Sequence, residues 1–89
     1  MLYNKILIGS NLIDPNTFLP SSGNYKTECK DYKVVTCFPS FENPKYCIMN
    51  CKCPKILADS NIKYYPASIK YPYGFGVSTS NDGKLYIEN

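Results

Sequence analysis

The sequence contains no arginine, histidine, glutamine or tryptophan. Because histidine is absent, the chain has no Ser–His or Cys–His pair for nucleophilic catalysis and no imidazole ligand for a metal. Arginine makes most of the bidentate contacts that proteins form with bases and phosphates, so its absence argues against nucleic acid as a partner. The basic residues are ten lysines spread along the chain, and a net charge of +3 predicts a solvated surface.

Other features of enzymes and membrane proteins are also missing. The chain has no Cys-x-x-Cys pair and no glycine-rich phosphate loop in a strand-to-helix context. Its carboxylates form no evident acid–base pair, so we expect no enzyme activity. The apolar run Ile6 to Ile8 near the amino terminus is shorter than the ~20 residues of a membrane span and the ~7–15 of a signal peptide. We therefore expect no membrane span.

The 89 residues predict a single small domain, residues 1–89. A 44% hydrophobic content suffices for one core, and a 19% charged content is too low for a disordered chain. A chain of this size buries only roughly 60–65% of the surface that its unfolded form exposes, so its stability is marginal without cross-links. This makes the five cysteines the main chemical feature of the sequence.

The β-branched and aromatic residues predict a mainly all-β domain of short antiparallel strands. Strands are expected at 2–8, 32–38 and 46–49. Residues 62–73 contain Pro66 and Pro72, which deny ladder hydrogen bonds, and this predicts edge strands or polyproline-like segments. At 74–89, alternating apolar residues flank Asn81-Asp82-Gly83, which is typical of a C-terminal β-hairpin.

Two segments are expected to lie outside the strands. Residues 9–26 contain Pro15, Pro20 and a Ser-Ser-Gly-Asn cluster, which predict an extended N-terminal loop or arm. A long loop is unusual in so small a domain and suggests a role in assembly. At most one short helix is expected, at 55–58, because Pro54 would occupy its first turn.

Five cysteines form a cysteine-rich centre at 29–53: Cys29, Cys37, Cys47, Cys51 and Cys53. We expect disulfides worth about 2–4 kcal/mol each, with one thiol left over, and the spacing does not choose among the fifteen arrangements. That thiol could pair with another chain or remain buried.

Two alternatives to disulfides stay open. One is reduced, buried thiols. The other is a zinc site, although a second closely spaced cysteine pair is missing; its ligands would be Cys37, Cys47, Cys51 and Cys53, with Cys29 as the alternative to Cys37. Disulfides would indicate a virion or an extracellular location, whereas reduced or zinc-bound cysteines would indicate the cytoplasm.

Aromatic residues supply the candidate interface. Tyrosine gives a large amphipathic contact area at a low cost in conformational entropy, which suits protein interfaces. The alternatives are that these residues form the core, or that they stack on sugars or single-stranded bases. The candidate interface residues are Phe18, Leu19, Tyr64, Tyr65, Tyr71, Tyr73 and Phe75.

These features predict a non-enzymatic structural or protein-interaction module that docks on a protein surface, by self-assembly or in a larger complex. The abundance of Lys, Asn, Ile and Tyr, whose codons are rich in A and T, indicates an AT-rich genome such as that of many viruses or of low-GC bacteria. We expect a viral structural or accessory protein. Two alternatives remain: a zinc-stabilised regulatory binding module and a secreted cysteine-bridged binder or toxin. Zinc, in the first alternative, is the one cofactor expected.

Overall fold

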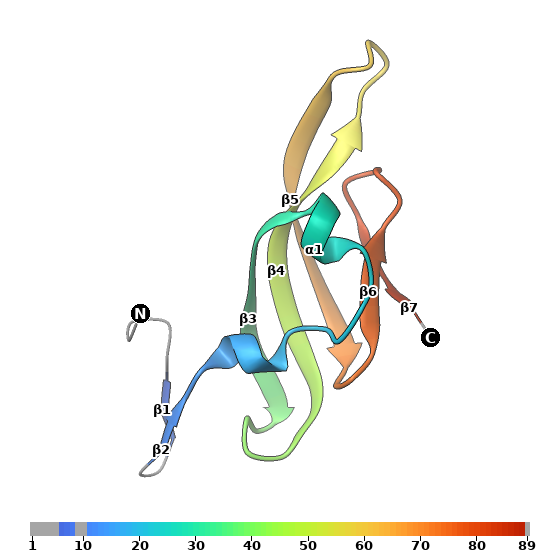
Figure 1. Cartoon of the computed structure of the whole chain (residues 1–89). Coiled ribbons are helices and arrows are strands. Elements are labelled where there is room, and N and C mark those ends of the chain that lie inside the picture. Colours follow the sequence, from blue (N-terminus) through green and yellow to red (C-terminus); the bar gives the residue numbers. More distant parts are fainter. Residues whose placement is uncertain (1–5, 9–10, 89) are drawn as a thin grey trace.

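The computed structural model describes residues 6–8 and 11–88 and confirms a mainly all-β fold (Figure 1). Most of the predicted 2–8 strand lies outside the described residues. The strands form three antiparallel sheets: β1 (Ile6–Ile8) with β2 (Asn11–Ile13), then β3 (Lys30–Pro39), β4 (Pro44–Ile56) and β5 (Ile62–Pro72) in that order, and β6 (Gly76–Thr79) with β7 (Leu85–Glu88). The helical elements are the 3-10 helix η2 (Pro15–Phe18) and the single turn α1 (Tyr25–Glu28).

The central sheet has longer strands than the sequence suggested. β3, β4 and β5 contain 10, 13 and 11 residues. β4 and β5 pair without interruption from Tyr46 opposite Pro72 to Ile56 opposite Ile62. The helix predicted at 55–58 is therefore wrong, because pairing of residues 55 and 56 with β5 outweighs the local helical preference after Pro54.

Pro54 is tolerated inside β4 because β3 does not pair with it. The first residue of β3, Lys30, pairs with Lys52, two residues before Pro54. The Pro54 carbonyl accepts a hydrogen bond from the Gly83 amide (2.9 Å), and the Ile56 amide donates to the Asn81 carbonyl (3.1 Å). Both groups of a strand residue point to the same side, so the Pro54 nitrogen also faces this turn and not β5. The 81–83 turn of the confirmed C-terminal hairpin thus covers the free edge of β4.

A β-bulge in β3 sets which of its side chains are buried. Val34 pairs with Met49 and Thr36 pairs with Ile48, so Val35 is an extra residue in the ladder. Without the bulge, Val34 and Cys37 would point to opposite faces of a regular strand, because they are three positions apart. With it, both side chains enter the core.

Residues 11–26, the described part of the predicted 9–26 loop or arm, contain short elements of secondary structure. This range contains β2, η2 and the start of α1, and its later part lies along β6. The Val77 amide donates to the Ser22 carbonyl (3.0 Å), while the Asn24 side-chain oxygen accepts from the Thr79 amide (2.8 Å). Hydrogen bonding to β6 thus incorporates this segment into the domain.

The domain has two layers (Figure 1). One layer is the β3–β4–β5 sheet, and the other contains η2, α1 and the β6–β7 hairpin. Residues from the second layer, including Tyr25, Val77 and the partly buried Phe18, pack against the cysteine-bearing face of the sheet. Within the described residues, no helix is long and apolar enough to span a membrane.

The packing of the 20–24 segment on β6 depends on Gly23. This residue has φ +104°, and a Cβ there would overlap the Val77 backbone. We expect Gly23→Ala to lower the free energy of unfolding by about 3 kcal/mol, from backbone strain and a displaced Ser22–Val77 hydrogen bond.

Gly74→Ala is the matched control for this prediction. Gly74 has φ +92°, but no neighbouring atom lies within 4 Å of a Cβ placed there. The alanine would pay only for its positive φ, so we expect urea denaturation to show a free energy of unfolding lower by about 1 kcal/mol. Equal losses in the two variants would show that the approach of Gly23 to Val77 has no energetic importance.

Candidate functional site

Strand alternation places four side chains of β4 on one buried face. Cys47, Met49, Cys51 and Cys53 are each separated by two positions and are all buried. Their period of two matches a half-buried strand, whose successive side chains point to opposite faces. Three cysteines of this strand thus enter the core together.

The cysteines pair with partners that lie directly opposite in the ladder. Cys37 faces Cys47 across β3 and β4, and their Cα atoms lie 4.0 Å apart. Cys29, next to the Lys30–Lys52 pair, bonds to Cys53 with a Cα separation of 4.3 Å. The structure thus contains the disulfides expected from the sequence and identifies their partners. Cys51 remains as the free thiol.

The Cys51 thiol lies against the Cys29–Cys53 disulfide. Its sulfur is 3.2 Å from the sulfur of Cys53, and the sulfurs of Cys29, Cys51 and Cys53 all lie within 4.8 Å of one another. Burial raises the pKa of Cys51 to about 11. At neutral pH the side chain is therefore a protonated thiol, a poor nucleophile and a poor metal ligand.

The zinc alternative placed Cys47, Cys51 and Cys53 on the metal, with Cys37 or, in its place, Cys29 as the fourth ligand. Instead, Cys37 and Cys47 are bonded to each other, and the cluster of three sulfurs contains Cys29. A cysteine in a disulfide has no thiolate to offer a metal, so a zinc site would require reduction of these bonds, and the sulfurs that lie together for it are those of Cys29, Cys51 and Cys53.

Two tyrosines belong to the core. Tyr71, a predicted interface residue, is 0% exposed and donates its hydroxyl to the Phe18 carbonyl (2.6 Å). Tyr25 is also buried and donates to the Pro20 carbonyl (2.7 Å). Burial raises the pKa of both hydroxyls, that of Tyr25 to about 12 with a smaller contribution from Tyr32. Tyr71 is therefore not available to a partner in the folded protein.

The remaining predicted interface residues do not form one surface. Phe18 and Leu19 are partly buried against the core, and the Phe18 ring packs on Phe41 with centroids 5.3 Å apart. Tyr73 also contacts Phe18. The other exposed members lie on β5 or in the turn that follows it: Tyr64, Tyr65 and Phe75.

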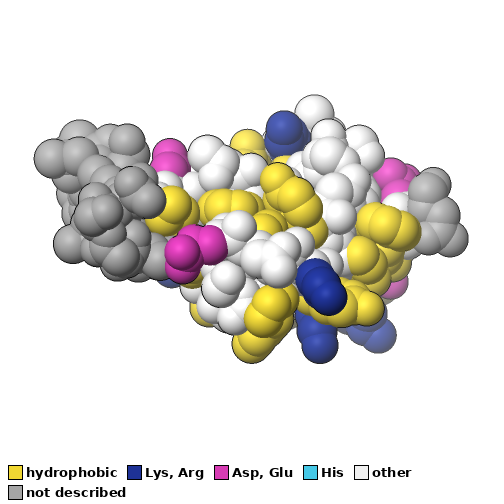
Figure 2. Space-filling model, turned by 90° about the horizontal axis from the view of Figure 1, so that it is seen from below, with side chains coloured by type: hydrophobic (Ala, Val, Ile, Leu, Met, Phe, Trp, Pro, Cys, Tyr) yellow, Lys and Arg dark blue, Asp and Glu magenta, His cyan; other side chains and the backbone are white. Residues whose placement is uncertain are grey.

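The opposite face of the central sheet carries an exposed group that the sequence analysis missed. Phe38 pairs with Tyr46, and Ile48 pairs with Lys70, on the side away from the cysteines. Phe38 is 44% exposed and Tyr46 46%. In Figure 2, lysine side chains lie beside hydrophobic ones along the lower rim of the molecule. We call Phe38, Tyr46, Ile48 and Lys70 the aromatic–lysine face.

Lys70 lies over both aromatic rings of this face. Its Nζ is 5.0 Å from the centroid of Tyr46 and 5.8 Å from that of Phe38, within the range of cation–π contacts. The sequence does contain a signal for this arrangement. Phe38 follows Cys37 and Tyr46 precedes Cys47, so burial of the two cysteines turns both rings outward.

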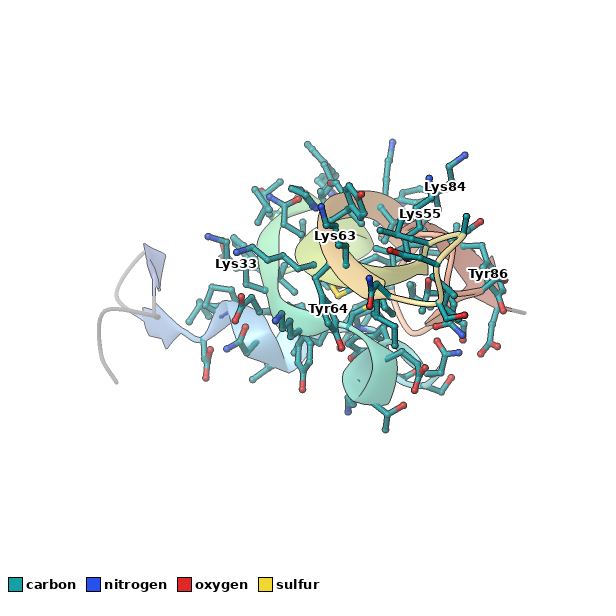
Figure 3. The ribbon with its side chains drawn as sticks, turned by 90° about the horizontal axis from the view of Figure 1, so that it is seen from above. Lys33, Lys55, Lys63, Tyr64, Lys84 and Tyr86 are labelled. Carbon is teal, nitrogen blue, oxygen red and sulfur yellow. A yellow bond between two sulfur atoms is a disulfide. The ribbon has the colours of Figure 1, made fainter. Side chains whose placement is uncertain are left out.

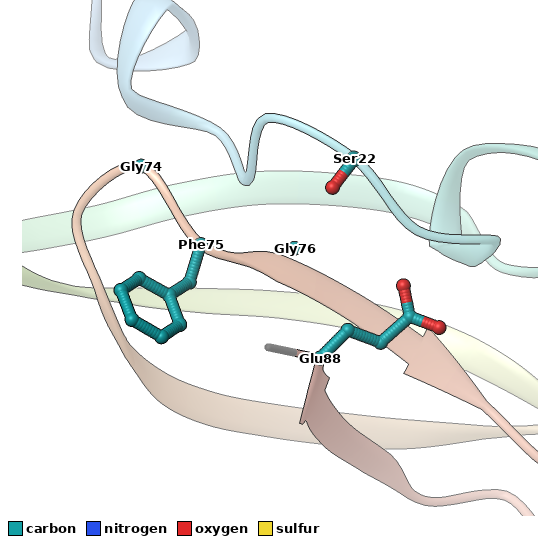
Figure 4. Close-up of a pocket in the computed structure, with 5 residues that line it drawn as sticks. All are labelled: Ser22, Gly74, Phe75, Gly76 and Glu88. Carbon is teal, nitrogen blue, oxygen red and sulfur yellow. The ribbon is translucent and has the colours of Figure 1, made fainter.

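One surface hollow, beside the turn between β5 and β6, is a poor small-molecule site. It is shown in Figure 4 and has a volume of about 260 Å³, with the Phe75 ring on one side and the Glu88 carboxylate on the other. Protein sites for small molecules usually enclose about 300–1,000 Å³ and bring together several polar groups. This hollow is smaller and has a single carboxylate.

The buried Tyr25 hydroxyl makes stability depend on alkaline pH. The neutral form is favoured in the folded state, with a pKa of about 12 against 10.0 for an ordinary tyrosine. The stabilisation that the buried neutral hydroxyl gives to the fold is therefore complete below pH 10 and is lost as the pH rises toward 12. The free energy of unfolding should fall more steeply over this range with Tyr25 than in Tyr25→Phe.

Urea denaturation as a function of pH tests this prediction. Both proteins should carry Cys51→Ala, so that ionisation of the thiol does not contribute. Parallel curves for the two proteins would contradict the role of Tyr25.

No protein-family model, curated protein or solved structure matches this chain. Its function is therefore argued from the positions and chemistry of its own side chains. The aromatic–lysine face and the cluster of three sulfurs are the features that support such an argument.

Proposed function

We propose that this protein is a non-enzymatic binding module that docks on an acidic protein surface through its aromatic–lysine face. The observation that carries the proposal is the position of Lys70, whose ammonium group lies over the exposed rings of Phe38 and Tyr46. Aromatic side chains beside a cation provide apolar contact area and charge complementarity in one place.

The cross-linked sheet beneath this face favours binding because it holds the rings in place. Phe38 is adjacent to Cys37 and Tyr46 is adjacent to Cys47, and the disulfide joins the two strands between them. A surface that is already ordered loses less conformational entropy when a partner binds.

The charge of the face favours an acidic partner. Strand register places Lys33 and Lys70 on the same side as the exposed rings, together with Lys52. Lys52 lies 3.8 Å from Asp31, but both side chains are well exposed, so this ion pair contributes little. The positive charges would steer an acidic surface toward the face and fix its orientation.

The composition of the face favours protein over nucleic acid. Ile48 lies in its centre and adds aliphatic area, which packs against apolar side chains better than against phosphates. Arginine, which dominates phosphate and base recognition, is absent from the chain. An acidic protein surface with apolar residues at its centre matches both properties.

The disulfides fit an oxidising setting, and this supports the outside of a cell or of a virus particle as the place of action. A structural or accessory viral protein that attaches to another protein satisfies this setting and the proposed binding role.

Titration of the ¹⁵N-labelled protein with short peptides rich in Asp, Glu and leucine tests the proposal by NMR. The amide signals of residues 38, 46, 48 and 70 should shift. Lys70→Glu should weaken binding by at least about tenfold, or ~1.4 kcal/mol, because it places like charges together.

Lys63→Glu is the matched control. Lys63 is an exposed lysine on the same strand as Lys70, seven positions away, so strand alternation places the two side chains on opposite sides of β5. Figure 3 shows the same alternation for the neighbouring residues Lys63 and Tyr64. Lys63→Glu should retain affinity within about twofold, allowing for the change in net charge. An equal loss of affinity in Lys70→Glu and Lys63→Glu would show that the effect comes from the net charge of the protein and not from the position of Lys70. Tighter binding of oligothymidylate at these residues would make the partner a nucleic acid and overturn the proposal.

A further inference from the structure

The three-sulfur cluster of Cys29, Cys51 and Cys53 combines a disulfide with a free thiol in contact with it. We propose that Cys51 acts as an internal exchange thiol that takes Cys53 from Cys29 and so moves the reactive thiol to Cys29, where it forms a mixed disulfide with a small disulfide molecule. The contact that carries this inference is the 3.2 Å separation between the sulfurs of Cys51 and Cys53.

The exchange is balanced in atoms and electrons. The Cys51 thiol gives its proton to solvent, and the thiolate attacks the sulfur of Cys53. A Cys51–Cys53 bond forms while the Cys53–Cys29 bond breaks, and the electron pair leaves on the sulfur of Cys29. The Cys29 thiolate then attacks an external disulfide, RSSR. The products are Cys29–S–SR and a thiolate RS⁻, which takes up a proton.

The two ends of this relay differ in their place in the sheet. Cys51 lies in the central strand β4, which is paired with a strand on each side, so its side chain cannot leave without disruption of the sheet. Cys29 lies at the end of α1, before the first ladder pair of β3. Exchange therefore transfers the thiol from the centre of the sheet to its margin.

The ladder beside Cys29 is also irregular. Lys30 pairs with Lys52, but the next pair is Lys33 with Asn50, so β3 has an extra residue there, and Asp31 has φ +55°. If the Cys29–Cys53 bond breaks, this end of β3 keeps only its irregular pairing with β4 and the hydrogen bond from the Cys29 amide to the Tyr25 carbonyl. This end is therefore the part of the strand that opens most easily.

The two pairings lie at opposite ends of the usual range of Cα separations for a disulfide. Cys29 and Cys53 lie opposite each other with Cα atoms 4.3 Å apart. Cys51 and Cys53 are two positions apart along one strand, a separation of about 6.6 Å, which is near the upper limit for a disulfide. Both pairings are therefore within reach of the folded strand, and capture of Cys29 by the external disulfide removes the exchanged form from the equilibrium. The high pKa of Cys51 adds a kinetic barrier.

The Cys37–Cys47 disulfide serves as an internal control. Among the five cysteines, a group of three neighbouring sulfurs forms only at Cys29, Cys51 and Cys53. The Cys37–Cys47 bond has no free thiol beside it, so it should remain intact while the other bond exchanges.

Incubation of the oxidised protein with glutathione disulfide, followed by an acid quench and alkylation, tests the inference. Tryptic cleavage gives the cysteine-containing peptides 27–30, 34–45, 46–52 and 53–55. Peptide 46–52 contains both Cys47 and Cys51, which fragmentation in the mass spectrometer distinguishes. Glutathione should appear on peptide 27–30, and peptide 53–55 should change its partner from 27–30 to 46–52. The rate should rise about tenfold per pH unit below the pKa of Cys51, because the thiolate is the attacking form.

Cys51→Ala should take up no glutathione under the same conditions. Glutathione on Cys51 with the original bridges intact would overturn the relay, because it would show direct reaction of the buried thiol. Equal uptake by Cys51→Ala would also overturn it, because the reaction would then not need Cys51.

Cys29→Ala tests whether Cys51 and Cys53 can form a disulfide in the folded chain, independently of the exchange rate. Oxidation of this variant should join Cys51 to Cys53, so that a folded protein with an intact Cys37–Cys47 bond has no alkylatable thiol. Two free thiols at 51 and 53 after oxidation would show that these residues cannot bond in the folded chain and would contradict the proposal.

Discussion

The register of β3 against β4 is the constraint on which the rest of the structure depends. Strand side chains alternate between faces, so a slip by one residue would exchange the buried and exposed sets. Cys37 bonds to the residue directly opposite it, Cys47, and Cys29 bonds to Cys53 at the other end of the ladder. Each bond also restricts the unfolded chain, by about 3 kcal/mol in the loop-entropy description. Two covalent links thus hold one register in a domain whose core is too small to hold it securely alone.

Both candidate functional features follow from this register. Burial of the odd-numbered residues of β4 brings Cys51 against the bond of Cys53. The same alternation turns Phe38 and Tyr46 to the opposite face, under the ammonium group of Lys70. The disulfide chemistry and the exposed aromatic surface are therefore two sides of one cross-linked sheet. A partner on the open face would not block the sulfur cluster on the other face.

The sequence predicted the features that short-range patterns control. The β-rich class, the strand at 32–38, the edge character of 62–73 and the hairpin around Asn81-Asp82-Gly83 all depend on local alternation or turn preference. The cysteine partners depend on long-range register, which the Val35 bulge shifts by one residue, and spacing alone does not encode that shift. The burial of Tyr71 and the exposure of Tyr64 follow from the same register, so composition alone could not separate core tyrosines from surface ones. The predicted helix at 55–58 failed for a related reason, since a distant strand decided its conformation.

Mapping of the disulfides in the oxidised, unmodified protein tests the central claim most directly. Alkylation in denaturant at acidic pH, followed by proteolysis, should find peptide 27–30 joined to 53–55 and peptide 34–45 joined to 46–52, with Cys51 as the alkylated residue. A bond between peptides 27–30 and 34–45, or alkylation of all five cysteines, would contradict the register. In that case neither the aromatic–lysine face nor the sulfur cluster would exist as described.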